Sequence, residues 1–110
     1  MIYFEKGSSD SILKDEDLKA GLFKALDSLG EKKKVMAIPP DYTRLPSKAG
    51  VLTSFVFEYY KNNLIDILPA LGTHTAMTES QIGHMLPGVD KQLFRLHDWR
   101  NDVVTIGEVP

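Results

Sequence analysis

The segment VMAIPPDYTRLP, residues 35–46, joins an abruptly ended apolar run to a polar loop. Val35 to Ile38 is short and apolar, as expected of a buried strand. The two prolines that follow cannot donate to a sheet ladder, so the chain must continue as a loop. A second run of this kind, Leu64 to Leu68, is limited by Pro69 and leads into the loop ALGTHTAM at residues 70–77.

Helical spacing of apolar residues surrounds these two runs. From Asp15 onward leucine and alanine recur at intervals of three and four, up to Gly30, which stands where the residue after a helix C-cap belongs. A second apolar stripe predicts a helix from about residue 48 to 61. Thr78 and Gln81 form a capping box, which predicts a short third helix before the next Pro-Gly pair.

The order of these elements predicts an α/β domain. Ile2 to Phe4 favours a brief first strand, and Val103 to Ile106 is expected to form another strand of the sheet. Strands that alternate with helices imply right-handed crossovers and a small, mainly parallel sheet covered by helices, as in a Rossmann-like three-layer domain. At this length, residues 1–110 are expected to form a single domain.

Composition narrows the class of function. The chain has 43% hydrophobic and 25% charged residues and a formal net charge of -2, which gives no general attraction to nucleic acid or to anionic lipid. No stretch approaches the roughly 18 apolar residues that a membrane span needs, so neither partner is expected and a cytoplasmic location is the default. The absence of cysteine excludes disulfides, thiolate metal sites and a cysteine nucleophile.

Polar side chains with useful chemistry follow both central strands. In an open parallel sheet, ligands bind outside the carboxyl ends of the strands. If the two strands are neighbours, Asp41 and Arg44 of the first loop face the same crevice as His74 of the second. Arginine can bind both oxygens of a small carboxylate, and an imidazole transfers protons near neutral pH. Gly72 permits a sharp exit from the strand, and Thr43 and Thr73 offer hydroxyls and amides to a phosphate.

Plainer interpretations remain open for the same residues. Asp41, Thr43 and Arg44 are also typical of an Asx turn with a surface ion pair, and His74 of a hydrogen bond to nearby backbone. His84 is expected to be a solvated helix residue, and His97 is assigned a structural role. None of the three histidines belongs to a His-x-x-His pair, so the sequence predicts no metal site. The run of lysines at residues 32–34 is interpreted as a solvated lead-in to the strand.

Three short motifs, in order along the chain and in register with the predicted loops, resemble the lactate racemase family. The segment from Val35 to Pro46 resembles the family's Asp-x-Thr-Arg-Pro motif, and residues 70–79 resemble its Gly-x-His loop followed by a Thr/Glu helix start. His97-Asp98 with residues 103–107 resembles the next segment. The likeness runs from about residue 33 to 107.

The resemblance implies an isomerase that racemises or epimerises 2-hydroxy acids with a nickel-pincer nucleotide. In that chemistry a histidine removes the hydroxyl proton while hydride passes from C2 to the cofactor and later returns to the other face. By this analogy His74 is one of two acid/base histidines, and Arg44 anchors the substrate. Asp41 and Thr43 would orient that pair or contact the cofactor, together with Gly72 and Thr73 as cofactor-binding residues.

The departures from the family set the limits of this expectation. Leu45 stands between Arg44 and Pro46, where the family has arginine followed directly by proline. The family's second base, its cofactor-tethering lysine and its nickel-ligating histidine lie beyond the matched region. The chain is therefore expected to be a partial polypeptide, without bound cofactor and inactive without the missing C-terminal domain. The alternatives are a standalone module that binds a small carboxylate or phosphate without catalysis, and a structural subunit that assembles with a separately encoded second half.

Overall fold

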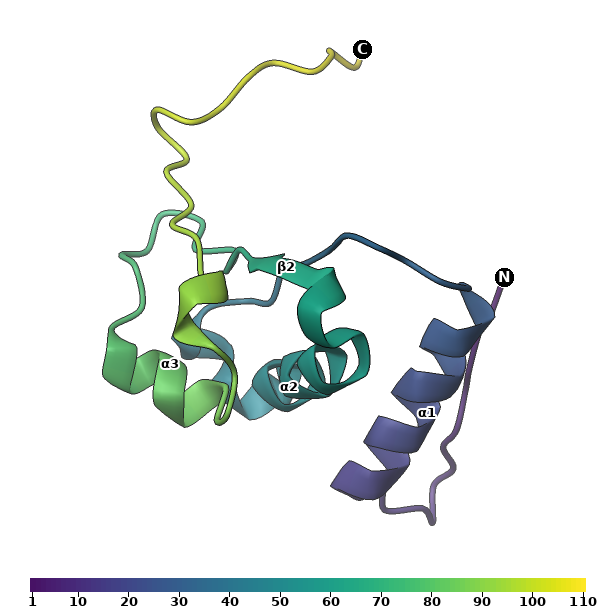
Figure 1. The fold of residues 1–110 in the computed structure, drawn as a ribbon. Coiled ribbons are helices and arrows are strands. Elements are labelled where there is room, and N and C mark those ends of the chain that lie inside the picture. Colours follow the sequence, from purple (N-terminus) through teal and green to yellow (C-terminus); the bar gives the residue numbers. More distant parts are fainter.

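The computed structural model describes residues 1–110, which form three α-helices and a small two-stranded sheet. The helices are α1 (Asp15–Ser28), α2 (Ala49–Tyr60) and α3 (Glu79–Met85), and the strands are β1 (Val35–Ala37) and β2 (Leu64–Ile67). Three short 3-10 helices, η1 (Tyr42–Ser47), η2 (Lys61–Asn63) and η3 (Lys91–Leu93), lie in the connections. In Figure 1, β2 lies beside α2, and α3 and α1 stand on opposite sides of α2.

The two strands pair in parallel, as the sequence predicts. Ala37 is opposite Ile67, and the register shifts by one residue between Val35 and Met36. The pairing continues past both strands, because an isolated parallel bridge joins Pro40 to Ala70. The carboxyl ends of β1 and β2 therefore stay side by side until the two polar loops begin.

The expected strand at Val103–Ile106 is not formed, and neither is a strand at Ile2–Phe4. The chain instead reaches the sheet earlier, where Phe94 forms a parallel bridge with Ile67 and the Arg95 N–H donates to the Ile67 carbonyl at 2.8 Å. Phe94 therefore occupies the position beside β2, and residues 103–106, further along the chain, lie beyond the sheet. Figure 1 shows them in the segment that runs away from the body of the molecule.

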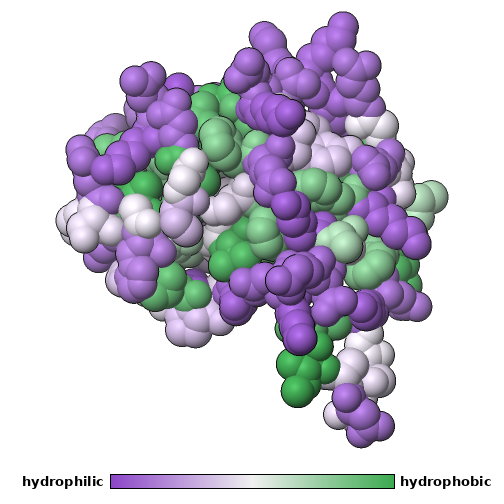
Figure 2. All heavy atoms as spheres, turned by 60° about the horizontal axis from the view of Figure 1, so that its bottom comes forward, coloured by the Kyte–Doolittle hydropathy of each residue, from purple (hydrophilic) through white to green (hydrophobic).

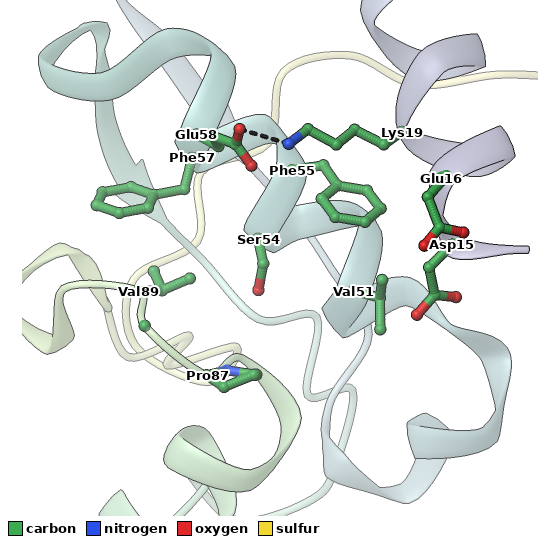
Figure 3. Close-up of a pocket in the computed structure, with 11 residues that line it drawn as sticks. Asp15, Glu16, Lys19, Val51, Ser54, Phe55, Phe57, Glu58, Pro87 and Val89 are labelled. Atoms are coloured by element: carbon green, nitrogen blue, oxygen red, sulfur yellow. Dashed lines mark hydrogen bonds and ion pairs between the residues drawn. The ribbon is translucent and has the colours of Figure 1, made fainter.

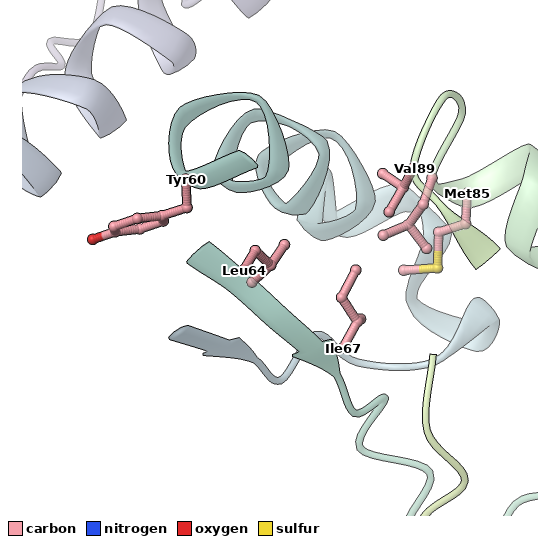
Figure 4. Close-up of a cluster of buried hydrophobic side chains, with 6 residues drawn as sticks. Tyr60, Leu64, Ile67, Met85 and Val89 are labelled. Atoms are coloured by element: carbon pink, nitrogen blue, oxygen red, sulfur yellow. The ribbon is translucent and has the colours of Figure 1, made fainter. Parts of the chain in front are cut away.

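The core lies between β2, α2 and the end of α3. It is made of six buried side chains, Tyr60, Leu64, Ile67, Met85, Leu86 and Val89. Figure 4 shows the side chains of Leu64 and Ile67 on the side of β2 that faces α2 and Met85. Gly50 of α2 permits this close packing, because a Cβ there would collide with the backbone carbonyl of Met85.

Helices cover one face of the sheet only. The opposite face exposes Met36, Ile38 and Ile65 at 50%, 63% and 39%. The expectation of a mainly parallel sheet covered by helices is therefore met on the α2 side, and residues 1–110 place no second helical layer on the other side. Hydrophilic side chains dominate the helix-bearing side, where hydrophobic ones emerge in separate patches (Figure 2).

Local signals explain where the helices begin and end. Three acidic residues occupy the first turn of α1, and Gly30 takes a φ of +70° just beyond the C-cap. The predicted capping box at Thr78 and Gln81 is present at the start of α3. None of the helices has the length and apolar character needed to cross a membrane.

Candidate functional site

The candidate site consists of the two loops that follow β1 and β2. Backbone hydrogen bonds hold these loops in register, since the Leu68 N–H donates to the Ala37 carbonyl at 2.9 Å and the Ala70 N–H donates to the Pro39 carbonyl at 2.8 Å. Proline has no N–H with which to extend the ladder further along the first strand. The two segments separate after the Pro40–Ala70 bridge. Asp41 follows directly, and its side chain contacts the second loop at His74.

Asp41 is the buried centre of the site, with an exposed fraction of only 5%. Its Oδ1 accepts two hydrogen bonds from Thr43, from the backbone N–H at 3.1 Å and from the hydroxyl at 2.5 Å. Its Oδ2 lies 2.6 Å from Nδ1 of His74. A buried carboxylate is costly unless its oxygens are paired, and here both oxygens have partners.

These contacts favour the ionised form of Asp41. The hydrogen bonds from Thr43 lower the pKa of Asp41 below the ordinary carboxyl value; burial opposes this shift, and the hydrogen bond with His74 adds to it. An ionised carboxylate can only accept hydrogen bonds, so Nδ1 of His74 carries the proton between them. A neutral imidazole then presents an unprotonated Nε2, which is able to take a proton from a ligand.

His74 itself is open to solvent, with a side chain that is 52% exposed. A turn from Leu71 to His74 turns the second loop back toward Asp41, closed by the His74 N–H donating to the Leu71 carbonyl at 3.0 Å. Gly72 adopts a φ of +57° within this turn, which residues with a Cβ rarely adopt. The result is one imidazole with an anchored nitrogen on a surface that a ligand can reach.

The other expected site residues lie in the same loops with fewer contacts. Thr43 directs both its amide and its hydroxyl to Asp41, which makes it a support for that carboxylate. Arg44 is exposed, its guanidinium takes part in no ion pair, and its backbone N–H donates to the Asp41 carbonyl at 3.0 Å. The Asx turn expected of this loop is therefore present, without the surface ion pair. Thr73 is exposed in the turn that precedes His74.

The fit of this chain to a nucleotide cofactor is partial. Next to Gly72 the position of a Cβ is open space, so a ligand could approach the backbone there. Thr73 offers an exposed hydroxyl, whereas the amide of Thr43 is already engaged by Asp41. No three His, Asp or Glu side chains are grouped so that they could hold a metal ion.

The large cavities of the molecule lie away from the two loops of the candidate site. None of the five best-defined cavities is lined by Asp41, Arg44 or His74. The largest, about 680 Å³, lies between α1, α2 and the turn after α3 (Figure 3). The pair of Asp41 and His74 therefore lies on an open surface at the carboxyl end of the two strands.

The structure also joins two residues that the sequence did not connect. The Tyr42 hydroxyl lies 2.7 Å from Nδ1 of His84, which attaches η1 to α3. The interpretation of His84 as merely solvated was incomplete, because its side chain is exposed but holds this contact. Only three-dimensional contact reveals the pair, since no local spacing links positions 42 and 84. His97 is half-buried, and its Nδ1 has no hydrogen-bond partner.

Comparisons with known proteins add no further assignment. No family model matches the chain, and neither a curated protein nor a solved structure shows significant similarity to it.

Proposed function

We propose that this chain is the N-terminal part of a lactate racemase-like enzyme, an isomerase that racemises or epimerises a small 2-hydroxy acid. Within this proposal the domain is Rossmann-like, its location is cytoplasmic, and a C-terminal domain completes the active site. The observation that carries the proposal is the contact between Nδ1 of His74 and the buried carboxylate of Asp41. It supports the role of His74 as a proton acceptor, because a neutral ring that donates from Nδ1 to Asp41 has its unprotonated nitrogen, Nε2, free to accept a proton.

Arg44 is assigned to the carboxylate of the substrate. Its guanidinium is exposed and free of ion pairs, and the backbone of the same loop ties it to Asp41. A planar guanidinium can donate to both oxygens of a carboxylate at once. The substrate hydroxyl would then lie toward His74, whose Nε2 takes the hydroxyl proton of one enantiomer, while the second base gives a proton to the hydroxyl of the other.

Asp41 and Thr43 act through His74. Thr43 holds Oδ1 of Asp41, and Oδ2 of Asp41 in turn fixes the imidazole and stabilises its positive charge after proton transfer. Both are positioning residues in this scheme. The arrangement parallels the general rule that a catalytic base is oriented by a third group.

A nickel-pincer nucleotide, when bound, supplies the acceptor for the hydrogen on C2. In this chain Gly72 and Thr73 are the residues placed to contact it, through open space beside the backbone and through an exposed hydroxyl. Its tether, its nickel ligand and the second base would come from the C-terminal domain, so residues 1–110 alone are expected to be inactive.

The test is racemisation of a 2-hydroxy acid by the full-length gene product, expressed with the enzymes that assemble the cofactor. His74→Ala is expected to abolish racemisation while the protein stays folded, and Thr75→Ala in the same loop serves as the matched control. Arg44→Lys is expected to raise KM roughly tenfold or more with a smaller effect on kcat, because lysine cannot bind two oxygens in a fork. Arg100→Lys is its control.

Near-normal turnover by either site variant would remove that residue from the proposed role. If the gene product contains no nickel and racemises nothing, yet His74 responds to lactate or phosphate in NMR titration, the chain is a binding module that performs no catalysis. That outcome would end the assignment of His74 as a base.

A further inference from the structure

One edge of the sheet is left without a partner. β2 lies between β1 and the Phe94 bridge, so the outer edge of β1 faces no other strand. The Ala37 carbonyl accepts a hydrogen bond from the β2 side. Because successive residues of a strand direct their backbone groups to alternate edges, Met36 and Ile38 present their N–H and C=O groups to the open edge. Such an edge is a template for pairing with another strand.

An apolar groove of about 560 Å³ follows this edge from end to end. Its floor is β1, and its walls come from the end of α1 and from one side of α2. The apolar wall residues are Leu26, Leu29, Leu52, Val56 and Tyr60. Lys32 and Lys34 line one end of the groove, and Pro39 and Pro40 line the other. The groove therefore fits a short apolar strand that carries negative charge near at least one of its ends.

The chain itself contains a segment of this kind. Val103–Ile106 is β-prone, forms no strand and is exposed, with exposed fractions of 84% for Val104 and 101% for Ile106. These two side chains lie on the same side of an extended segment, since side chains alternate along a strand. Asp102 and Glu108 flank the segment with negative charge.

We infer that the open edge of β1 binds the Val103–Ile106 segment of a second copy of this chain as an added strand. The added strand would hydrogen-bond to Met36 and Ile38, place Val104 and Ile106 against the apolar walls, and bring a flanking carboxylate to the lysines. In either strand direction one of the two flanking acids lies at the lysine end. The lysine run that precedes β1 thereby gains a role as the charged end of a docking groove.

A second copy is favoured over the chain's own segment by the position of the edge. The segment leaves the body from the Phe94 side of β2, whereas the open edge belongs to β1 on the other side of β2. Figure 1 shows the segment directed away from the body. Exchange between two copies also repeats the contact twice about a two-fold axis, so that each copy donates one strand and receives one.

The first experiment is sedimentation of the 110-residue chain over a concentration series. The inference predicts a dimer, and it predicts that a variant lacking residues 102–110 is a monomer with the same circular dichroism and cooperative unfolding. A wild type that stays monomeric at every concentration would overturn it. So would a dimer that survives the deletion, or a monomer whose Val103–Ile106 amides are protected from exchange by the chain's own edge.

Backbone pairing is tested by replacing Val104 and Thr105 together with proline. Proline removes the N–H that an added strand needs, and the exposed position of both residues leaves the fold intact. The dissociation constant of the dimer is expected to rise at least roughly tenfold, since proline removes hydrogen bonds as well as side chains. Replacement of the same two residues with alanine is the matched control, and it should weaken the dimer less. Equal effects would argue against strand addition.

Charge pairing is tested by reversal on both sides. Lys32→Glu with Lys34→Glu should weaken the dimer, and so should Asp102→Lys with Glu108→Lys, whereas mixing the two variants should restore association in a salt-dependent manner. Lys24→Glu with Lys91→Glu is the control, because both lysines lie outside the groove. If the mixture fails to recover, the lysines do not receive the segment.

Discussion

The two faces of the sheet differ sharply in what covers them. On the α2 side, Leu64 and Ile67 are 1% and 0% exposed. On the opposite side, Met36 and Ile38 are 50% and 63% exposed, although they belong to the same small sheet. Apolar residues alone thus do not make a core, because a second element must pack on them. The covered face therefore accounts for the stability of the fold, whereas the open face contributes little to it.

The largest expected effect breaks the covered face. Leu64→Ala should lower the free energy of unfolding by about 2–5 kcal/mol, since it removes a fully buried side chain from a packed cluster. Ile38→Ala on the open face is the matched control. Urea denaturation monitored by circular dichroism measures both, and equal losses would contradict the difference between the faces.

A second prediction concerns how tightly the covered face is packed. Gly50→Ala should destabilise the protein by about 1–3 kcal/mol, because its Cβ would collide with the backbone of Met85. Gly83→Ala in α3 is the control, since nothing lies near its Cβ position. That change should stabilise by up to about 1 kcal/mol, in line with the intrinsic preference of helices for alanine. Stabilisation by both changes would show that α2 and α3 pack loosely.

The third prediction concerns Asp41, at the end of the sheet where the two loops meet. Asp41→Asn should cost about 1–3 kcal/mol at neutral pH, because it weakens the hydrogen bonds to Thr43 and His74. The folded state lowers the pKa of Asp41, so its contribution is present above the ordinary carboxyl range near 4 and disappears as the pH falls through the lowered value.

Urea denaturation from pH 7 down to pH 2 checks this dependence. The difference between wild type and Asp41→Asn should shrink as the solution becomes more acidic. Asp10→Asn, at an exposed position, should change the stability by less than about 0.5 kcal/mol at neutral pH. A difference for Asp41→Asn that stays constant to pH 2 would mean that the carboxylate is not stabilised in its charged form.

The smallest effect is expected on the open face. Ile38→Ser should change the stability of the monomer by less than about 0.5 kcal/mol, because most of its side chain is already in water. Thermal unfolding at low protein concentration measures the monomer alone. A loss comparable with that of Leu64→Ala would mean that the open face is covered in solution.

The sequence predicts most of the fold that depends on local signals. The helical spacing from Asp15, the capping box at Thr78 and the two proline-terminated strands all have counterparts in the structure. The approach of Asp41 to His74 could also be anticipated, because neighbouring parallel strands bring their loops to one edge. These features depend on the spacing of residues along the chain, or on the one assumption that the two strands are neighbours in the sheet.

The sequence-based predictions fail where the structure of a segment depends on which other segment packs against it. Val103–Ile106 has the composition of a strand, but Phe94 occupies the position beside β2, and the segment forms no strand within its own chain. Composition could not reveal this competition. Likewise, nothing in the spacing of Tyr42 and His84 announces their hydrogen bond, because it depends on how α3 packs on η1.

In this structure Asp41 holds Nδ1 of His74, so that a neutral ring has its unprotonated nitrogen at Nε2. Long-range ¹H–¹⁵N correlation spectra of the 110-residue chain at pH 8 test it most directly, since they distinguish a protonated from an unprotonated ring nitrogen. We expect a protonated Nδ1 and an unprotonated Nε2 for His74, and loss of this preference in Asp41→Asn. An Nε2-protonated ring, or a spectrum unchanged by Asp41→Asn, would contradict it.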